Sequence, residues 1–389
     1  MIGSLQQPYP LQGINDGHLK KLCQVLWNWE LCETCQNGQP CRGPKCPWRR
    51  SSRLQAFFDF YKEVTSSYVP ELLFGSQPAL RSHDDVCDII RFLKSQQGAS
   101  RSELTVQYFS RRAKDSELPP IADQHRAFNI AVKVMSMVTC SAENQPSGLL
   151  ELGTQPLPWH DDTSFASFIA RAFPKVDIGD LEIKDNSGKT TDVKSAITAR
   201  QLKKIAALSF RGTDSLRNHL RLDARNGVVE IYHYTSVLKE HLMASQLQQG
   251  FVANIPNQIC IEVLHSLQMI LFPFDSDSEL ILRGLVSNES FDPDCIHYDF
   301  AAYGEDNICY SYFGSRLMEL YEEVKNPTPR GLVERWFERK SGARYAMMAT
   351  LVGVLIAVIL GMLSLAVGIF QAWVSYEAWK HPVVSGVGS

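Results

Sequence analysis

The stretch AMMATLVGVLIAVILGMLSLAVGIFQAWV, residues Ala346 to Val374, decides the fold class of this chain. No Asp, Glu, Lys or Arg occurs between Tyr345 and Tyr376. A helix needs about 20 apolar residues to cross the hydrocarbon core of a bilayer, and a soluble core helix does not need so long an uncharged run. The sequence therefore predicts a single transmembrane helix over residues 346–374, with the lipid bilayer as its partner.

The charges that flank this helix predict its orientation. A basic juxtamembrane helix is expected over residues 327–345, and only a short tail, 375–389, follows the apolar run. Positive charge marks the cytosolic side of a membrane-spanning segment. The N-terminus has no apolar signal segment. We therefore expect a tail-anchored, single-pass membrane protein whose N-terminal part lies in the cytosol.

Small residues recur at every fourth position of the predicted membrane helix. They are Ala349, Gly353, Ala357 and Gly361. Such a stripe allows two helices to approach closely within a bilayer, so it predicts helix–helix self-association. The alternative is that these residues reflect only the general abundance of small residues in membrane helices.

The residues ahead of the helix have the composition of a folded soluble part. The 389 residues are 44% hydrophobic and 21% charged, with a formal net charge of −3. These fractions are typical of globular proteins, and the length allows two or three small domains. A charge balance so close to neutral does not favour a nucleic-acid binder.

Periodicity and turn residues divide this soluble part into segments. We expect an N-terminal helix and a cysteine-rich segment in residues 1–50, followed by a helical region in 51–140. Several prolines and glycines predict a linker-rich region in 141–195. Residues 251–326 predict a second helical region that contains a short strand pair.

Residues 196–250 have the pattern of a winged-helix-like module. Thr198 is expected to cap one helix and Asp214 a second, and the pair Asn226-Gly227 predicts a β-hairpin. The predicted fold class is therefore mainly α, with a small α+β winged-helix-like module and a single C-terminal transmembrane helix. Several arginines in this module would suit contact with nucleic acid. The membrane helix favours protein binding instead, because a fold alone does not fix function.

Four cysteines lie close together near the N-terminus, at Cys32, Cys35, Cys41 and Cys46. Four thiolates at this spacing can surround a zinc ion, and the glycines and prolines between them supply turns. Such a site would be structural, since four protein ligands leave no open position for catalysis. The alternative is a loop that merely contains cysteines.

A basic cluster follows directly, with the sequence KCPWRRSSR at residues 45–53. Cations interleaved with an aromatic residue could bind phosphates or act as a nuclear address. The alternative is the solvated start of a helix.

Cys295 and His297 alternate with apolar residues, so they are expected on one face of a short strand. A Cys–His pair can form a nucleophile. The alternative is a buried cysteine of the core. The chain contains no P-loop, dinucleotide fingerprint, GxSxG or HExxH motif.

Two segments resemble a group of filamentous-fungal proteins. They are ITARQLKKIAALSFRGTDSLRNHLRLDARNGVVEIYHYTSVLKEHL and NPTPRGLVERWFERKSGARYAMMATLVGVLIAVILG. These fungal proteins carry a single C-terminal transmembrane helix behind a soluble part. A weaker similarity is to hypoxia-responsive morphology factors of moulds, which influence gene-cluster expression and hyphal surface properties. The resemblance implies no catalytic residue.

Together these features lead us to expect a non-enzymatic, membrane-anchored scaffold or regulatory interaction protein with a protein partner. One alternative is a fungal regulator of gene-cluster expression or hyphal morphology that acts in the nucleus. Another is an enzyme with its site at Cys295 and His297.

Overall fold

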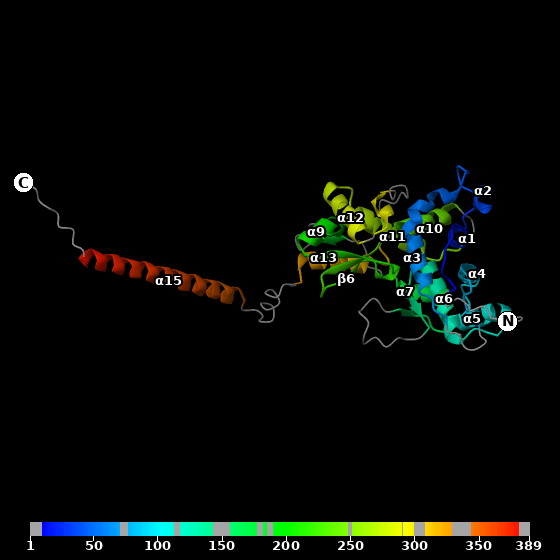
Figure 1. Ribbon diagram of the computed structural model, residues 1–389, viewed down its shortest axis with the longest axis horizontal. Coiled ribbons are helices and arrows are strands. Elements are labelled where there is room, and N and C mark those ends of the chain that lie inside the picture. The colour runs from blue at the N-terminus through cyan, green and yellow to red at the C-terminus, as the bar shows by residue number, and fades with distance from the viewer. Residues whose placement is uncertain are drawn as a thin grey trace, which may run out of the picture. The chain divides into compact units, whose positions relative to one another are not determined.

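The computed structural model describes residues 10–70, 77–112, 117–142, 156–176, 182–184, 190–247, 251–289, 291–298, 308–328 and 344–380. For residues 182–184, 190–192 and 344–349 the structure describes only the backbone. The chain divides into two units, Met1–Thr328 and Pro329–Ser389. Helices dominate both units, as the sequence predicts (Figure 1).

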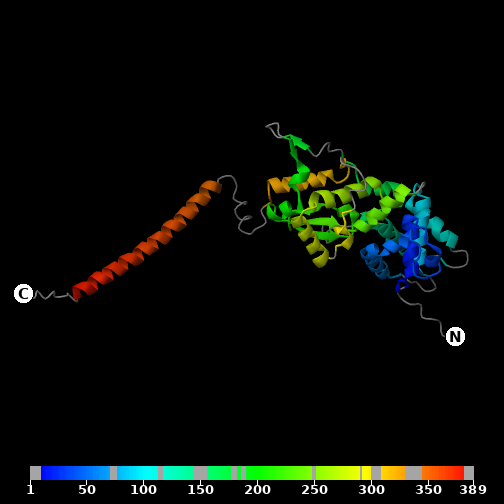
Figure 2. The same ribbon diagram turned by 90° about the horizontal axis from the view of Figure 1, so that it is seen from above.

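The first unit begins with a set of helices. These are α1 (Asp16–Trp27), α2 (Glu33–Gln36), the 3-10 helix η1 (Pro47–Leu54), α3 (Gln55–Ser66), α4 (His83–Ser95), α5 (Arg101–Arg112) and α6 (Ile121–Ser136). The expected helical region is therefore confirmed. Figure 2 shows these helices gathered at one end of the unit, with the later elements at the other end.

The ends of these helices follow their capping residues. The side chain of Asn15 accepts a hydrogen bond from the amide of His18, and α1 begins there. Asn28 has φ 52°, a left-handed conformation that ends α1. Ser82 and Asp85 form the capping box that starts α4.

The helices pack through the apolar faces that their periodicity predicts. Leu22, Cys23 and Leu26 of α1 are buried, and so are Phe57 and Tyr61 of α3. Burial of each such side chain stabilises the fold by about 1.5–3 kcal/mol. This core fixes α1 and α3, between which the cysteines lie in the sequence.

The second half of the first unit contains a three-stranded sheet. Its strands are β5 (Ser209–Thr213), β6 (Arg221–Asp223) and β7 (Val228–Tyr232), in the order β5-β7-β6. Strand β7 pairs in parallel with β5 and antiparallel with β6. The predicted β6–β7 hairpin is confirmed. Its loop closes through Gly227, which has φ 67° and donates its amide to the carbonyl of Asp223 at 2.8 Å.

The winged-helix-like module is not confirmed. Thr198 caps α9 (Ala199–Lys204) as expected, but the second helix is wrong: a single 3-10 turn, η3 (Leu216–Asn218), stands in its place. Asp214 accepts a hydrogen bond from the hydroxyl of Tyr234 at 2.8 Å rather than capping a helix. The amide of Leu216 donates to the carbonyl of Met137 at 2.9 Å. These contacts with other elements hold the segment in a turn.

Helices surround this sheet. They are α7 (Phe165–Ala172), α8 (Val193–Ala196), α10 (Thr235–Leu247), α11 (Asn257–His265), the π-helical turn η4 (Ser266–Leu271), α12 (Ser276–Asn288), the 3-10 turn η5 (Pro293–Ile296) and α13 (Gly314–Lys325). Four short strands also occur, β1 (Cys140–Ser141), β2 (Leu157–Pro158), β3 (Glu182–Lys184) and β4 (Thr190–Asp192).

The short strand pair predicted within 251–326 is wrong for the described part of that region, which contains only helices and turns. The reason is local. Pro293 starts the turn η5, and the side chain of Asp292 accepts a hydrogen bond from the amide of Asp294 at 3.0 Å. An Asx contact of this kind favours a turn over an extended strand.

The described part of the second unit, residues 344–380, forms the helix α15 (Arg344–Lys380). Within its segment Thr350–Lys380, an 18-residue window has a mean hydropathy of 2.7, and none of that window is buried within the chain. The helix is long and apolar enough to cross a membrane. The predicted basic helix lies mostly outside the described residues, as does the end of the tail.

Candidate metal centre

The four predicted cysteines come together in the structure. Their sulfur atoms all lie within 4.8 Å of one another. The Cys32 and Cys41 sulfurs are 4.0 Å apart, and the Cys35 and Cys46 sulfurs are 3.8 Å apart. In a tetrahedral site with Zn–S bonds of about 2.3 Å, geometry gives sulfur–sulfur edges of about 3.8 Å. The cluster therefore has the size that a metal ion requires.

Turns around the cysteines create this arrangement. The short helix α2 begins after Cys32 and carries Cys35, and Gly38 continues the chain with φ +73°. Gly43 approaches the cluster closely, since a Cβ atom there would lie 2.9 Å from Cys32 Cβ and 3.2 Å from Cys46 Cβ. Only glycine fits at residue 43 without displacing the ligands.

The cysteines are free thiols rather than disulfides. The hydroxyl of Thr34, 3.2 Å from the Cys32 sulfur, lowers the pKa of Cys32 to about 5. Burial raises the pKa of Cys35, and the neighbouring sulfur atoms raise it further. Four adjacent thiols thus resist joint deprotonation unless a cation offsets the charge. The cluster could hold a metal ion on these grounds.

Flanking helices hold the cysteine segment, residues 32–46, in place. The Lys20 ammonium of α1 donates to the carbonyl of Cys35 at 3.2 Å and lies 5.2 Å from the centre of the Trp48 ring. Trp48 belongs to η1, which follows the last cysteine. The segment is therefore fixed from both sides.

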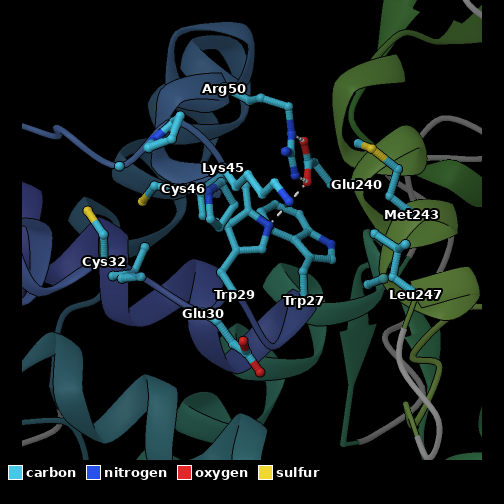
Figure 3. Close-up of a pocket in the computed structure, with 15 residues that line it drawn as sticks. Trp27, Trp29, Glu30, Cys32, Lys45, Cys46, Arg50, Glu240, Met243 and Leu247 are labelled. Atoms are coloured by element: carbon cyan, nitrogen blue, oxygen red, sulfur yellow. Dashed lines mark hydrogen bonds and ion pairs between the residues drawn. The ribbon is translucent and has the colours of Figure 1, made fainter.

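An ion pair connects η1 to α10. The Arg50 guanidinium donates to both carboxylate oxygens of Glu240, at 2.6 and 2.8 Å, and the Trp29 indole donates to the same carboxylate at 3.1 Å. Glu240 is buried, with its side chain 6% exposed. Figure 3 shows the end of Arg50 directly beside Glu240, with the Trp29 ring next to the pair. This two-pronged geometry is the stronger kind of ion pair.

A second set of charges lies next to the first. The Arg53 guanidinium is 3.1 Å from the buried carboxylate of Asp294, which also lies 2.8 Å from the Lys239 ammonium. Two cations of the basic cluster therefore have internal partners, whereas Lys45 and Arg49 are exposed. The cluster is partly a solvated helix start and partly a structural connection to α10 and η5.

A pocket of about 720 Å³ opens between the cysteine segment and α10 (Figure 3). Cys32 and Cys46 contribute to its wall, so the metal centre and the pocket share residues. The other side of the pocket is formed by α10. Its lining includes Trp27, Trp29, Pro44, Lys45, Met243 and Leu247.

The structure does not bring Cys295 and His297 together as a site. The predicted strand is the turn η5, Cys295 is fully buried, and His297 is exposed. The Cys295 thiol donates to the carbonyl of His233 at 3.0 Å, and burial raises its pKa. This environment is that of a core cysteine rather than a nucleophile.

Sequence reasoning missed the acids that pair with the basic cluster. A signal exists in α10, where Lys239, Glu240 and His241 are consecutive in the part of the helix, residues 235–242, in which every residue is buried. Charged residues inside such a helix need partners from other elements. No protein-family model, curated protein or solved structure matches the chain, so the fungal resemblance stays a prediction.

Proposed function

We propose that this protein is a non-enzymatic interaction protein, anchored in a membrane by α15, that binds a protein partner in the pocket beside a structural zinc ion. The main support for this proposal is that two cysteines of the cluster, Cys32 and Cys46, also line the pocket. A metal that fixes these cysteines would fix the shape of the pocket.

Zinc is the metal that the ligands favour. Four thiolates in a tetrahedron of this size are typical of structural zinc sites. The chain's own residues would supply every ligand, so the metal would hold Gly43 and the start of η1 rather than activate water. Arg50 and Trp48 then keep their positions against α10 and α1.

The lining of the pocket suits a protein partner. Two tryptophans and Met243 offer the aromatic and sulfur-containing surface that is enriched in interface cores. Leu247, at the end of α10, is 81% exposed. An exposed leucine beside a pocket is a suitable first contact for an apolar side chain of a partner.

The orientation follows from the charges that flank α15. Cations outnumber acids in residues 327–345, which supports a cytosolic N-terminal part and a short tail across the membrane. Gly353, Ala357 and Gly361 offer a close-packing face for a second copy of the helix. Nuclear action is the alternative, with exposed Lys45 and Arg49 as the address.

The partner pocket is tested by capture from cell extract with full-length protein in detergent. Leu247→Asp should abolish a specific partner band, because it places a charge at the pocket. The matched control is Leu280→Asp on α12, where the leucine is 69% exposed and lies outside the pocket lining. Equal capture by both variants would contradict the pocket assignment.

The anchor is tested separately by alkaline carbonate extraction and protease protection of tagged protein. We expect the protein to stay with the membrane and its N-terminal tag to be digested in intact organelles. Release into the soluble fraction, or nuclear signal lost in the variant Arg49→Ala, would favour the nuclear alternative.

A further inference from the structure

Arginines from four elements of the first unit gather beside the sheet. They are Arg171 on α7, Arg217 on η3, Arg221 on β6 and Arg316 on α13, and we name them the arginine cluster. The Arg316 guanidinium donates to the carbonyl of His219, which lies between Arg217 and Arg221 in the chain. Helix α13 thus brings Arg316 against the segment that carries Arg217 and Arg221.

Among the residues that the structure describes, carboxylates do not balance this charge. Arg211, Glu230 and Arg221 face one another across the three strands. Both arginines contact the same Glu230 oxygen, at 2.7 and 2.9 Å. One buried carboxylate therefore serves two guanidinium groups. Arg316 has a neutral carbonyl as its acceptor, and the charges of Glu230 and the exposed Glu319 act on it. The described arginines still outnumber these carboxylates, so the cluster retains a positive excess.

Arg217 is the centre of this excess. Its side chain is half-buried, yet it makes no hydrogen bond or ion pair with any residue that the structure describes. Burial lowers its pKa, and the like charges of Arg221 and Arg171 lower it further. A half-buried guanidinium without an acceptor is unfavourable unless a ligand supplies one.

We propose that the arginine cluster binds a phosphate monoester group, with Arg217 as its principal contact. The planar guanidinium fork matches phosphate oxygens, and a dianion suits the excess of positive charge. A phosphorylated lipid headgroup and a soluble phosphate ester carry this same chemistry. The inference is independent of the partner pocket, because the two sites use different residues.

Calorimetric titration of full-length protein in detergent tests the site, with inositol 1,4,5-trisphosphate and inorganic phosphate as probes. We expect the trisphosphate to bind and Arg217→Ala to weaken it at least about tenfold, since a charge-assisted contact is lost. The control Arg283→Ala removes an exposed arginine of α12 that pairs with Glu279 at 2.7 Å. It should leave the affinity unchanged.

Loss of binding in Arg217→Ala could also result from misfolding, so a second variant that should bind more tightly is needed. Glu319 is exposed and its charge acts on Arg316. Glu319→Gln should therefore raise the affinity about twofold to threefold by removing a competing carboxylate. The pocket variant Leu247→Asp should not change the affinity, so failure of the pocket and failure of the phosphate site are distinguishable.

The source of the phosphate is decided in lipid nanodiscs with and without phosphatidylinositol 4-phosphate. Weaker trisphosphate binding in its presence identifies the lipid headgroup as occupant, and equal binding identifies a soluble ester. The proposal is overturned if no phosphate monoester binds at millimolar concentration, if Arg217→Ala binds like wild type, or if a DNA oligonucleotide binds instead.

Discussion

The basic cluster after the cysteines and the arginine cluster beside the sheet use the same side chains in opposite ways. Arg50 and Arg53 each meet a buried carboxylate, Glu240 and Asp294. Arg217 meets other cations and, within the described residues, makes no ion pair. Charges that are satisfied within the fold hold elements together, whereas a surplus of half-buried charge indicates a ligand.

This difference separates structure from binding in the first unit. The ion pairs of η1 connect the cysteine segment with α10 and η5, so they support the candidate metal centre. The arginine cluster uses α7, η3, β6 and α13, and its charges repel one another. Substitutions should therefore lower stability in the first region and ligand affinity in the second.

Removal of the metal should produce the largest effect. A structural zinc site contributes an apparent binding free energy on the order of 10 kcal/mol. Treatment with a chelator, or Cys35→Ser, should lower the melting temperature by at least about 5 °C and expose residues 32–54 to hydrogen exchange. Cys309→Ser, at an exposed free cysteine, is the matched control and should leave both unchanged.

Loss of the buried Glu240 carboxylate should have the second-largest effect on stability. Glu240→Gln leaves Arg50 and the Trp29 indole with a neutral acceptor, which should lower the free energy of unfolding by about 3 kcal/mol. Urea denaturation measures this value. The control Glu279→Gln breaks an exposed pair with Arg283 and should change it by less than about 0.5 kcal/mol. Similar values for both variants would contradict a structural role for Arg50.

Low pH should lower the stability of the fold through His219, which directly follows the turn η3. Burial lowers the pKa of His219 from 6.5 to about 3, and the charge of Arg316 lowers it further. Below pH 6.5 the unfolded chain binds a proton that the folded chain does not. His219 therefore contributes stability above that pH, which is lost by about 1.4 kcal/mol per pH unit as the pH falls toward 3.

The slope of unfolding free energy against pH, measured from pH 7 to 5, tests this assignment. His219→Gln should reduce the slope by about one proton. His297→Gln, at an exposed histidine, serves as the control. An unchanged slope in His219→Gln would show that this histidine is protonated equally in both states.

The smallest effect on stability should come from the arginine cluster itself. Arg217→Met keeps the length of the side chain and removes a repelled charge, so unfolding free energy should change by less than about 0.5 kcal/mol or rise. Arg50→Met should lower it by about 3 kcal/mol, because it leaves the buried Glu240 carboxylate without its cation. Thermal unfolding of both variants measures these changes. A larger loss of stability in Arg217→Met than in Arg50→Met would contradict the proposed difference between the two regions.

The sequence predicts local features of this chain well. The long uncharged run predicts α15, the pair Asn226-Gly227 predicts the β6–β7 hairpin, and the cysteine spacing predicts the cluster. These signals depend on residues that are near one another in the chain. Long-range contacts leave no such pattern, so the pairing of Arg50 with Glu240 and the approach of Arg316 to His219 could not be predicted.

The same limit explains the errors. Asp214 is a residue type that often caps helices. Here its carboxylate instead accepts a hydrogen bond from the hydroxyl of Tyr234, which lies on another segment. Cys295 has a plausible partner two residues away, but the thiol is directed to the carbonyl of His233. In both cases a tertiary contact outweighs a local preference.

X-ray absorption at the zinc edge of purified full-length protein tests the central claim most directly. The account predicts one zinc per chain with four sulfur neighbours at about 2.3 Å, and loss of this signal in Cys35→Ser but not in Cys309→Ser. Protein without zinc, or zinc surrounded by oxygen and nitrogen, would contradict it.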